Sequence, residues 1–200
     1  LLIFFIWLIL IFTSGMSMIF LIILFLVLIL IFFYLVFFVP KFVYIKNRLL
    51  SFFDTETGTH NFQSDKALDS IMSGGFFGKG IGEGTLKNRV PEAHTDYIIS
   101  VISEEFGVIA IMLILVLFLV FIFSILKKVD KEANNTVRLI LVGSASLILL
   151  QAMIHIGVNI RLFPTTGMTL PFLSYGGSSI LGTAILSGII LNLTKRRINQ

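Results

Sequence analysis

The stretch VPEAHTDYIISVISEEFG, residues 90–107, marks the point where the chain passes from a polar loop into a membrane span. It carries five ionisable side chains, those of Glu92, His94, Asp96, Glu104 and Glu105. Residues 107–126 are uncharged, and about 20 mainly apolar residues are enough to cross a bilayer as a helix. Charges gathered at the mouth of such a span indicate either a helix cap or a functional loop.

The composition excludes a soluble domain. Hydrophobic residues make up 56% of the chain and charged residues 13%, with a mean hydropathy of +1.01, whereas roughly a quarter of the residues of soluble domains are charged. The chain has no cysteine, which excludes disulfides and thiolate metal sites. The net charge of +4 comes without a basic stripe interleaved with aromatic residues, so nucleic acid is not an expected partner.

Apolar runs of membrane-spanning length dominate the chain. They predict an all-α fold, a polytopic transmembrane helix bundle with one large outward-facing loop, residues 40–106, that contains short helices. The first run has no basic leader, so we interpret it as the end of a truncated span and not as a signal peptide. The predicted spans are residues 1–12 (partial), 16–39, 107–126, 137–158 and 172–194, all within one multi-span membrane domain.

Basic residues predict the orientation of the spans, because short cytoplasmic loops are enriched in Lys and Arg. They gather at Lys127, Lys128, Lys131 and Arg138 and again at Lys195, Arg196 and Arg197. We therefore expect residues 127–136 and the C-terminal tail to be cytoplasmic and loop 40–106 to face outward.

The large loop contains two recognisable segments. NFQSDKALDSIMSGG, residues 61–75, is typical of a short amphipathic helix that stops at glycine. The glycine-rich stretch 74–84 follows, and its backbone amides could cradle an anion or simply form a flexible turn. It matches neither the P-loop nor the dinucleotide-binding pattern, which argues against nucleotide binding.

The acidic residues of the opening stretch have two interpretations. Thr95 or Asp96 could be the N-cap of the following helix. Alternatively, Asp96 could be a general base, because a partly desolvated carboxylate at the membrane boundary is suited to proton abstraction. Glu104 and Glu105 could lie at the interface or line a cavity.

The C-terminal third combines polar residues with helix breakers. Gln151 and His155 share one face of the 137–158 helix, where a single His is more typical of an interhelical hydrogen bond than of a metal ligand. Arg161 could meet a phosphate or lipid headgroups. Prolines and glycines between residues 164 and 177 break the helix, which indicates either a substrate groove or a structural kink. Beyond Ser178 the small residues form faces suited to close helix packing.

Three ordered segments resemble a known family. SGGFFGKGIGEG (73–84), PEAHTDYIISVISEEFG (91–107) and FPTTGMTLPFLSYGGSS (163–179) are similar to motifs of the SEDS family (shape, elongation, division and sporulation), the polytopic bacterial peptidoglycan glycosyltransferases FtsW and RodA. The resemblance covers residues 34–197 and corresponds to the C-terminal half of the family. Ala93 makes the chain most like FtsW, the cell-division member. Residues 54–61 depart from the family's sequence pattern, so no feature of the family is assigned to them.

This resemblance implies a function and its participants. Asp96 would be the outward-facing catalytic base that polymerises lipid II into glycan strands at the bacterial cytoplasmic (inner) membrane. Basic groups or a divalent cation, Mg²⁺ or Mn²⁺, would stabilise the leaving pyrophosphate. Expected partners are the undecaprenyl-linked substrate, a class B penicillin-binding transpeptidase, other divisome membrane proteins and membrane lipid. The candidate substrate-binding residues are Lys66, Lys79, Lys87, Arg89, Glu92, His94, Arg161, Ser178 and Ser179.

Two other functions fit parts of the sequence. Broken helices and intramembrane polar residues suit a transporter that moves lipid II across the membrane. Small-residue faces around Gly182 and Gly188 suit a scaffold that recruits the transpeptidase. An outward carboxylate without a chain of charges through the membrane favours the enzyme.

Overall fold

The predicted all-α fold is confirmed by a computed structural model that describes residues 2–53, 59–90 and 93–195. No strand occurs in these ranges. The helices are α1 (Leu2–Thr13), α2 (Met18–Phe38), the 3-10 turn η1 (Pro40–Phe42), α3 (Val43–Phe53), α4 (Thr59–Gly74), α5 (Leu86–Arg89), α6 (Ile98–Val129), α7 (Asn135–Asn159) and α8 (Gly177–Thr194).

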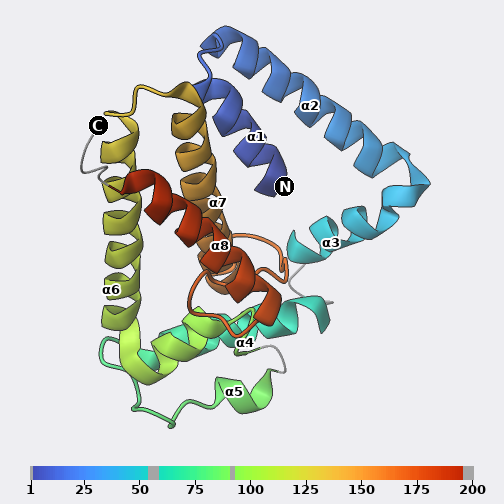
Figure 1. Ribbon diagram of the computed structural model, residues 1–200. Helices are drawn as coiled ribbons and strands as arrows, with labels where there is room; N and C mark the ends of the chain where they lie inside the picture. Colours follow the sequence, from blue (N-terminus) through green and yellow to red (C-terminus); the bar gives the residue numbers. More distant parts are fainter. Residues whose placement is uncertain (1, 54–58, 91–92, 196–200) are drawn as a thin grey trace.

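The predicted polytopic membrane architecture is also confirmed. Within the described ranges α2, α6, α7 and α8 are long and apolar enough to cross a bilayer, and α1 is a shorter apolar helix. Helix α7 packs against α1, α6 and α8 (Figure 1). Contacts among Ile122, Leu141, Ile148 and Ile190 form the apolar core between α6, α7 and α8. Helix α2 buries only Val36 among its described residues, so its apolar side chains face outward from the chain.

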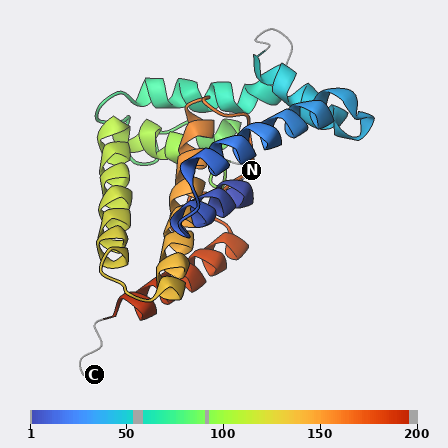
Figure 2. The same cartoon turned by 90° about the horizontal axis from the view of Figure 1, so that it is seen from above.

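One end of the bundle is covered by a layer of short segments that we call the cap layer. It consists of α4, the glycine-rich loop 75–85, α5 and the part of α6 before Gly107. Both views show α4 lying across the end of α6 (Figures 1 and 2). The amphipathic segment predicted at residues 61–75 is thus helical and ends at Gly74. The cap layer has its own core, in which Ala67, Leu86, Tyr97 and Val158 are buried.

Helix α6 changes direction at Gly107, where the backbone is not helical (φ 80, ψ 179). An unbroken helix of 32 residues would be about 48 Å long, well beyond the hydrocarbon thickness of about 30 Å. The kink divides α6 into residues 98–106, which lie in the cap layer, and the part after Gly107, which spans the membrane. The helix therefore starts at Ile98, before the predicted span at residues 107–126.

The glycine-rich loop pairs with the backbone groups that the kink exposes. In an unbroken helix, Val108 N and Ile109 N would donate to the carbonyls of Glu104 and Glu105. Here the carbonyls accept from Lys79 N (2.8 Å) and Gly80 N (3.1 Å). The amides donate instead to two loop carbonyls, Gly75 O at 2.9 Å and Phe76 O at 3.5 Å. All four backbone groups therefore have a hydrogen-bond partner, as required near a membrane. Because the amides of Lys79 and Gly80 already donate to the carbonyls of Glu104 and Glu105, they are not available to bind an anion, which argues against the predicted phosphate cradle.

Close backbone contact at this junction requires glycine. A Cβ atom on Gly107 would overlap Phe76 O, and one on Gly78 would overlap Glu105 O. The φ and ψ angles of Gly107 also lie in a region that residues with a Cβ avoid. Gly78 and Gly107 thus serve an ordered junction, which argues against a flexible turn at this point of the stretch.

The buried side chain of Glu104 holds the glycine-rich loop in place. Its side chain is 1% exposed and accepts from Lys79 Nζ (2.8 Å), Leu86 N (2.9 Å) and Thr85 Oγ1 (3.1 Å). Burial alone would raise the pKa of this carboxyl, but the Lys79 ammonium and the other donors outweigh burial and lower it to about 2. Glu104 is therefore an ionised, buried anchor and does not lie at the lipid interface.

We predict that Gly107→Ala destabilises the protein. Backbone strain alone should cost about 1–3 kcal/mol, and the overlap with Phe76 O adds to it. The measurement is the Tm of the detergent-purified full-length protein. Gly177→Ala, at the first residue of α8, is the matched control, because a Cβ there meets nothing within 4 Å. Equal Tm values for the two variants would contradict the account of the kink.

We also predict that Glu104→Gln lowers stability by about 1.5–3 kcal/mol, the range for hydrogen bonds to a charged group. Because the pKa of Glu104 falls from 4.5 to about 2 on folding, its contribution is complete above pH 4.5 and is lost as the pH falls toward 2. The difference in Tm between wild type and Glu104→Gln should shrink across that interval. Glu83→Gln, an exposed change in the same loop, should leave the Tm unchanged at every pH.

Candidate functional site

The segment between α7 and α8 is irregular backbone held in place by side chains of α7. Gln151 Nε2 donates to Thr169 O (2.9 Å), and His155 Nδ1 donates to Met168 O (2.7 Å). Both donors lie on the face of α7 that the sequence identified, and His155 makes an interhelix-type hydrogen bond. Irregular backbone at the depth of a spanning helix is tolerated where protein groups satisfy it or where it lines a cavity. Both conditions are met here.

A polar-sided groove of about 620 Å³ lies between α7, this segment and the start of α8. Thr169 Oγ1 donates to Ser179 Oγ (2.6 Å) and joins the segment to α8. Helix α8 begins at Gly177, after the predicted start at residue 172, because the break extends through Tyr175. The residues that give the groove its polar wall are Gln151, Thr169, Ser178, Ser179 and Thr183.

Asp96 lies in the turn before α6, and the backbone of this turn is fixed from two sides. His94 O accepts from Tyr175 N (3.1 Å), and Thr95 O accepts from Ser174 Oγ (2.7 Å). Asp96 O accepts from Asn159 Nδ2 (3.0 Å). Three successive carbonyls are thus bonded to α7 or to the segment before α8, which fixes the position of the half-buried Asp96.

The carboxylate of Asp96 lies at the edge of the groove. A Cβ atom built on Gly167, which lines the groove, would lie 3.6 Å from Asp96 Oδ2. The N-cap alternative for Thr95 or Asp96 is wrong, because the N-cap residue of α6 is Tyr97, whose side chain makes no capping hydrogen bond.

Tyr97 and Arg48 complete the surroundings of this carboxylate. Burial raises the pKa of Tyr97 to about 12, with a further increase from the charge of Asp96 and an opposing effect from Arg48, so the phenol stays neutral. Arg48, from α3, donates to Thr165 O and to Thr165 Oγ1 (3.0 Å). No local sequence pattern links Arg48 to Thr165, which lies 117 positions away in the chain.

Three of the predicted basic residues line a different pocket. Lys66, Lys79 and Arg89 line a separate pocket of about 210 Å³ in the cap layer, together with Asp69 and Glu104. Lys66 pairs with Asp69 (3.3 Å), and Lys79 pairs with Glu104 (2.8 Å).

The remaining candidates divide into three groups. Arg161 forms an ion pair with Asp65 of α4 (2.6 Å), an intramolecular partner that neither sequence alternative foresaw. His94 is exposed next to Asp96, and Ser178 and Ser179 line the groove. Glu92 and the side chain of Lys87 lie outside the described residues.

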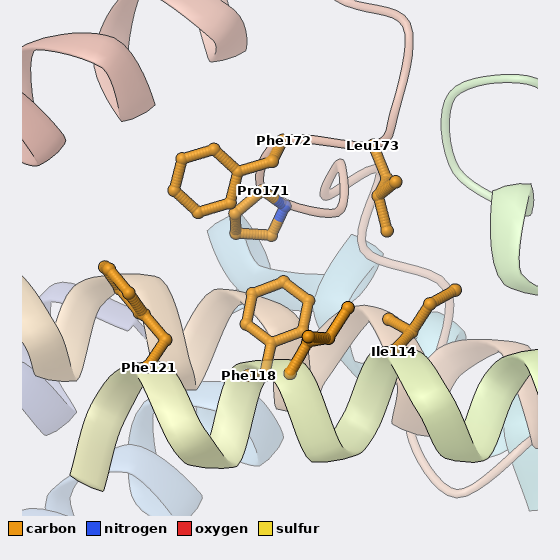
Figure 3. Close-up of a pocket in the computed structure, with 7 residues that line it drawn as sticks. Ile114, Phe118, Phe121, Pro171, Phe172 and Leu173 are labelled. Atoms are coloured by element: carbon orange, nitrogen blue, oxygen red, sulfur yellow. The ribbon is translucent and has the colours of Figure 1, made fainter. Parts of the chain in front are cut away.

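An apolar pocket of about 300 Å³ lies between α6 and residues 171–173. Figure 3 shows the ring of Phe172 facing Phe118 and Phe121, with ring centroids 6.4 and 6.2 Å apart. Phe172 adopts a positive φ of 68, which turns its side chain toward α6. The segment before α8 is therefore held by hydrogen bonds to α7 on one side and by aromatic packing on α6 on the other.

Comparison with known proteins agrees with this architecture. The model of the FtsW/RodA/SpoVE family, described as cell cycle proteins, matches residues 1–199. The chain is 40% identical over 140 residues to the probable peptidoglycan glycosyltransferase FtsW of Enterococcus hirae. It is 41% identical over 142 residues to the protein of the same name from Caulobacter vibrioides. These matches cover 70% and 71% of this chain but 35% and 36% of the relatives, so the chain spans little more than a third of their length.

A solved structure shares the fold. It comes from work on the structural coordination of polymerization and crosslinking by a peptidoglycan synthase complex. One of its chains superposes with a TM-score of 0.64 at 26% identity, covering 86% of this chain and 50% of that one. The family model, the relatives and this structure lead to one conclusion: the chain belongs to the FtsW/RodA/SpoVE family of membrane-embedded cell cycle proteins.

Proposed function

We propose that this chain contains the catalytic centre of a peptidoglycan glycosyltransferase that polymerises lipid II during cell division, with Asp96 as the general base. The observation that carries the proposal is the carboxylate of Asp96 at the edge of a groove beside a broken membrane helix. The names of the relatives, which include peptidoglycan glycosyltransferase activity, support the same reaction.

The chemistry requires a base, a bound acceptor and a leaving group. Asp96 would take the proton of the acceptor sugar's 4-hydroxyl as its oxygen attacks the anomeric carbon of the donor. The new glycosidic bond forms as the bond to undecaprenyl pyrophosphate breaks, and Asp96 later releases its proton to water. The fixed backbone of residues 94–96 suits this role, because proton transfer depends on accurate placement of the base.

The groove suits a substrate that carries both sugars and a lipid. Ser178, Ser179 and Thr169 could bind sugar hydroxyls, while the membrane surrounds the polyprenyl chain. Arg48 is an additional candidate for the pyrophosphate, because its guanidinium binds the segment that contains Gly167. Lys66, Lys79 and Arg89 stay candidates for anion binding in the cap layer.

A divalent cation, Mg²⁺ or Mn²⁺, stays a prediction of the family resemblance. Within the described residues, no three His, Asp or Glu side chains are close enough to form a metal site. We therefore assign no metal ligands to this chain and derive no step through a cation.

The partners would be a class B penicillin-binding transpeptidase and other divisome membrane proteins. One observation keeps the scaffold function as a second candidate: Cβ atoms built on Gly182 and Gly188 of α8 meet no described atom within 4 Å. This face is open for packing against a helix outside the described residues. For the transporter function we find no charged pathway through α7 or α8. Their described polar side chains carry no Lys, Asp or Glu, and the one Arg among them, Arg138, lies in the first turn of α7.

The decisive test is lipid II polymerisation by the complete natural polypeptide with its cognate transpeptidase. Asp96→Asn should reduce glycan product by at least about 10²-fold, because general base catalysis contributes 10²–10⁴-fold. Asp130→Asn, the same change at an exposed position beyond the far end of α6, should keep wild-type activity. Undiminished product from folded Asp96→Asn would remove Asp96 from this role.

The proposed orientation, with the cap layer outside the cytoplasmic membrane, can be tested by cysteine labelling. Residues 1–200 contain no cysteine, so Ile81→Cys in the exposed glycine-rich loop and Glu132→Cys between α6 and α7 each add one site to this part of the protein, and any cysteine elsewhere in the polypeptide is first replaced by serine. An impermeant maleimide added to intact spheroplasts should label Ile81→Cys and should label Glu132→Cys only after lysis. The reverse labelling pattern would contradict the proposed orientation and would place the cap layer in the cytoplasm.

A further inference from the structure

Asn159, the last residue of α7, forms a complete hydrogen-bond junction beneath Asp96. The side chain is 0% exposed. Its Nδ2 donates to Asp96 O (3.0 Å) and to His155 O (2.8 Å). Its Oδ1 accepts from Ser100 N (3.2 Å) and from Ser100 Oγ (2.7 Å).

This arrangement uses the full capacity of an amide side chain. An asparagine amide has two N–H donors and one oxygen that accepts two hydrogen bonds, and all four positions are occupied here. A buried polar group whose partners are all present has a single favourable orientation. Asn159 therefore fixes three places relative to one another: the end of α7, the turn that carries Asp96 and the first turn of α6.

The two sides of the turn have different attachments. His94 O and Thr95 O are bonded to the segment before α8, through Tyr175 N and Ser174 Oγ. The carbonyl of Asp96 accepts its hydrogen bond from a residue of α7, Asn159. The same helix holds the groove wall through Gln151 and His155, eight and four positions before Asn159. Helix α7 thus carries both the wall of the groove and the support of the carboxylate at its edge.

We propose that Asn159 is a positioning residue for Asp96, which sets the distance between its carboxylate and the groove. The inference rests on the proposed function. Asn159 acts through the Asp96 carbonyl and not on the substrate. Without the Nδ2 donor, Asp96 O would lose the hydrogen bond that ties it to α7, so the peptide following Asp96 would shift and displace the side chain.

The test uses two substitutions in the full-length protein with its cognate transpeptidase. Asn159→Asp keeps an oxygen toward Ser100 and removes both N–H donors, whereas Asn159→Leu removes all four hydrogen bonds at similar size. We expect each variant to lower kcat for lipid II polymerisation by about 10²-fold, the effect of a small misplacement of a catalytic group. The KM for lipid II should stay unchanged, because the groove wall held by Gln151 and His155 is intact.

Ser100→Ala is the matched control. It removes the hydroxyl bond to the same amide but leaves the bond between Asn159 and Asp96, so kcat should match wild type. A second readout is amide hydrogen exchange, which in Asn159→Asp should rise at residues 95–98 and stay unchanged at the α6 kink.

The outcomes separate this inference from the proposed function. Loss of activity in Asp96→Asn but wild-type kcat in both Asn159 variants would overturn the positioning role alone. A fall in folded protein that accounts for all the lost activity would make Asn159 a structural residue and would also overturn it. If Asp96→Asn itself keeps full activity, the proposed function fails first.

Discussion

The backbone exchange at Gly107 is the constraint on which the rest of the structure depends. A kink in a helix that enters a membrane exposes two carbonyls and two amides, and unpaired groups there cost several kcal/mol each. The glycine-rich loop supplies a partner for each of them. As a result, residues 98–106 leave the direction of the span and lie in the cap layer, where Glu104 fixes the loop. The turn that carries Asp96 directly precedes this segment, so its direction follows from the kink.

The site combines two kinds of support. Polar side chains of α7 and Ser174 hold irregular backbone by directional hydrogen bonds. Aromatic packing of Phe172 on α6 holds the same region from the apolar side. Directional bonds fix where backbone groups lie, while apolar packing keeps the segment against the bundle at a depth where water is scarce. Neither kind of support alone would fix both the wall of the groove and its edge.

Much of the architecture could be predicted from local sequence. The apolar runs indicated the spans, and the break between Pro164 and Gly177 indicated irregular backbone beside a helix. Proximity between distant residues could not be predicted. The pair Lys79–Glu104 is 25 positions apart, and Arg48–Thr165 is 117 positions apart. Arg161 resembled an anion-binding residue because its partner Asp65 lies on a helix far away in the sequence. Asn159 gave no signal at all, because an asparagine at a helix end is ordinary and only the packed structure reveals its four hydrogen bonds.

The sequence separations of these contacts also imply an order of assembly during synthesis. The cap layer is closed by contacts between residues 75–86 and 104–109, which leave the ribosome close together in time. The bonds that fix Asp96 join it to residue 159, and Thr95 to residue 174, across separations of 63 and 79 positions. The contacts between the glycine-rich loop and α6 can therefore form before α7 is complete, whereas the groove edge forms only after the last loop has been translated. A nascent chain stopped before residue 159 would hold the Asp96 turn without the contacts that orient it.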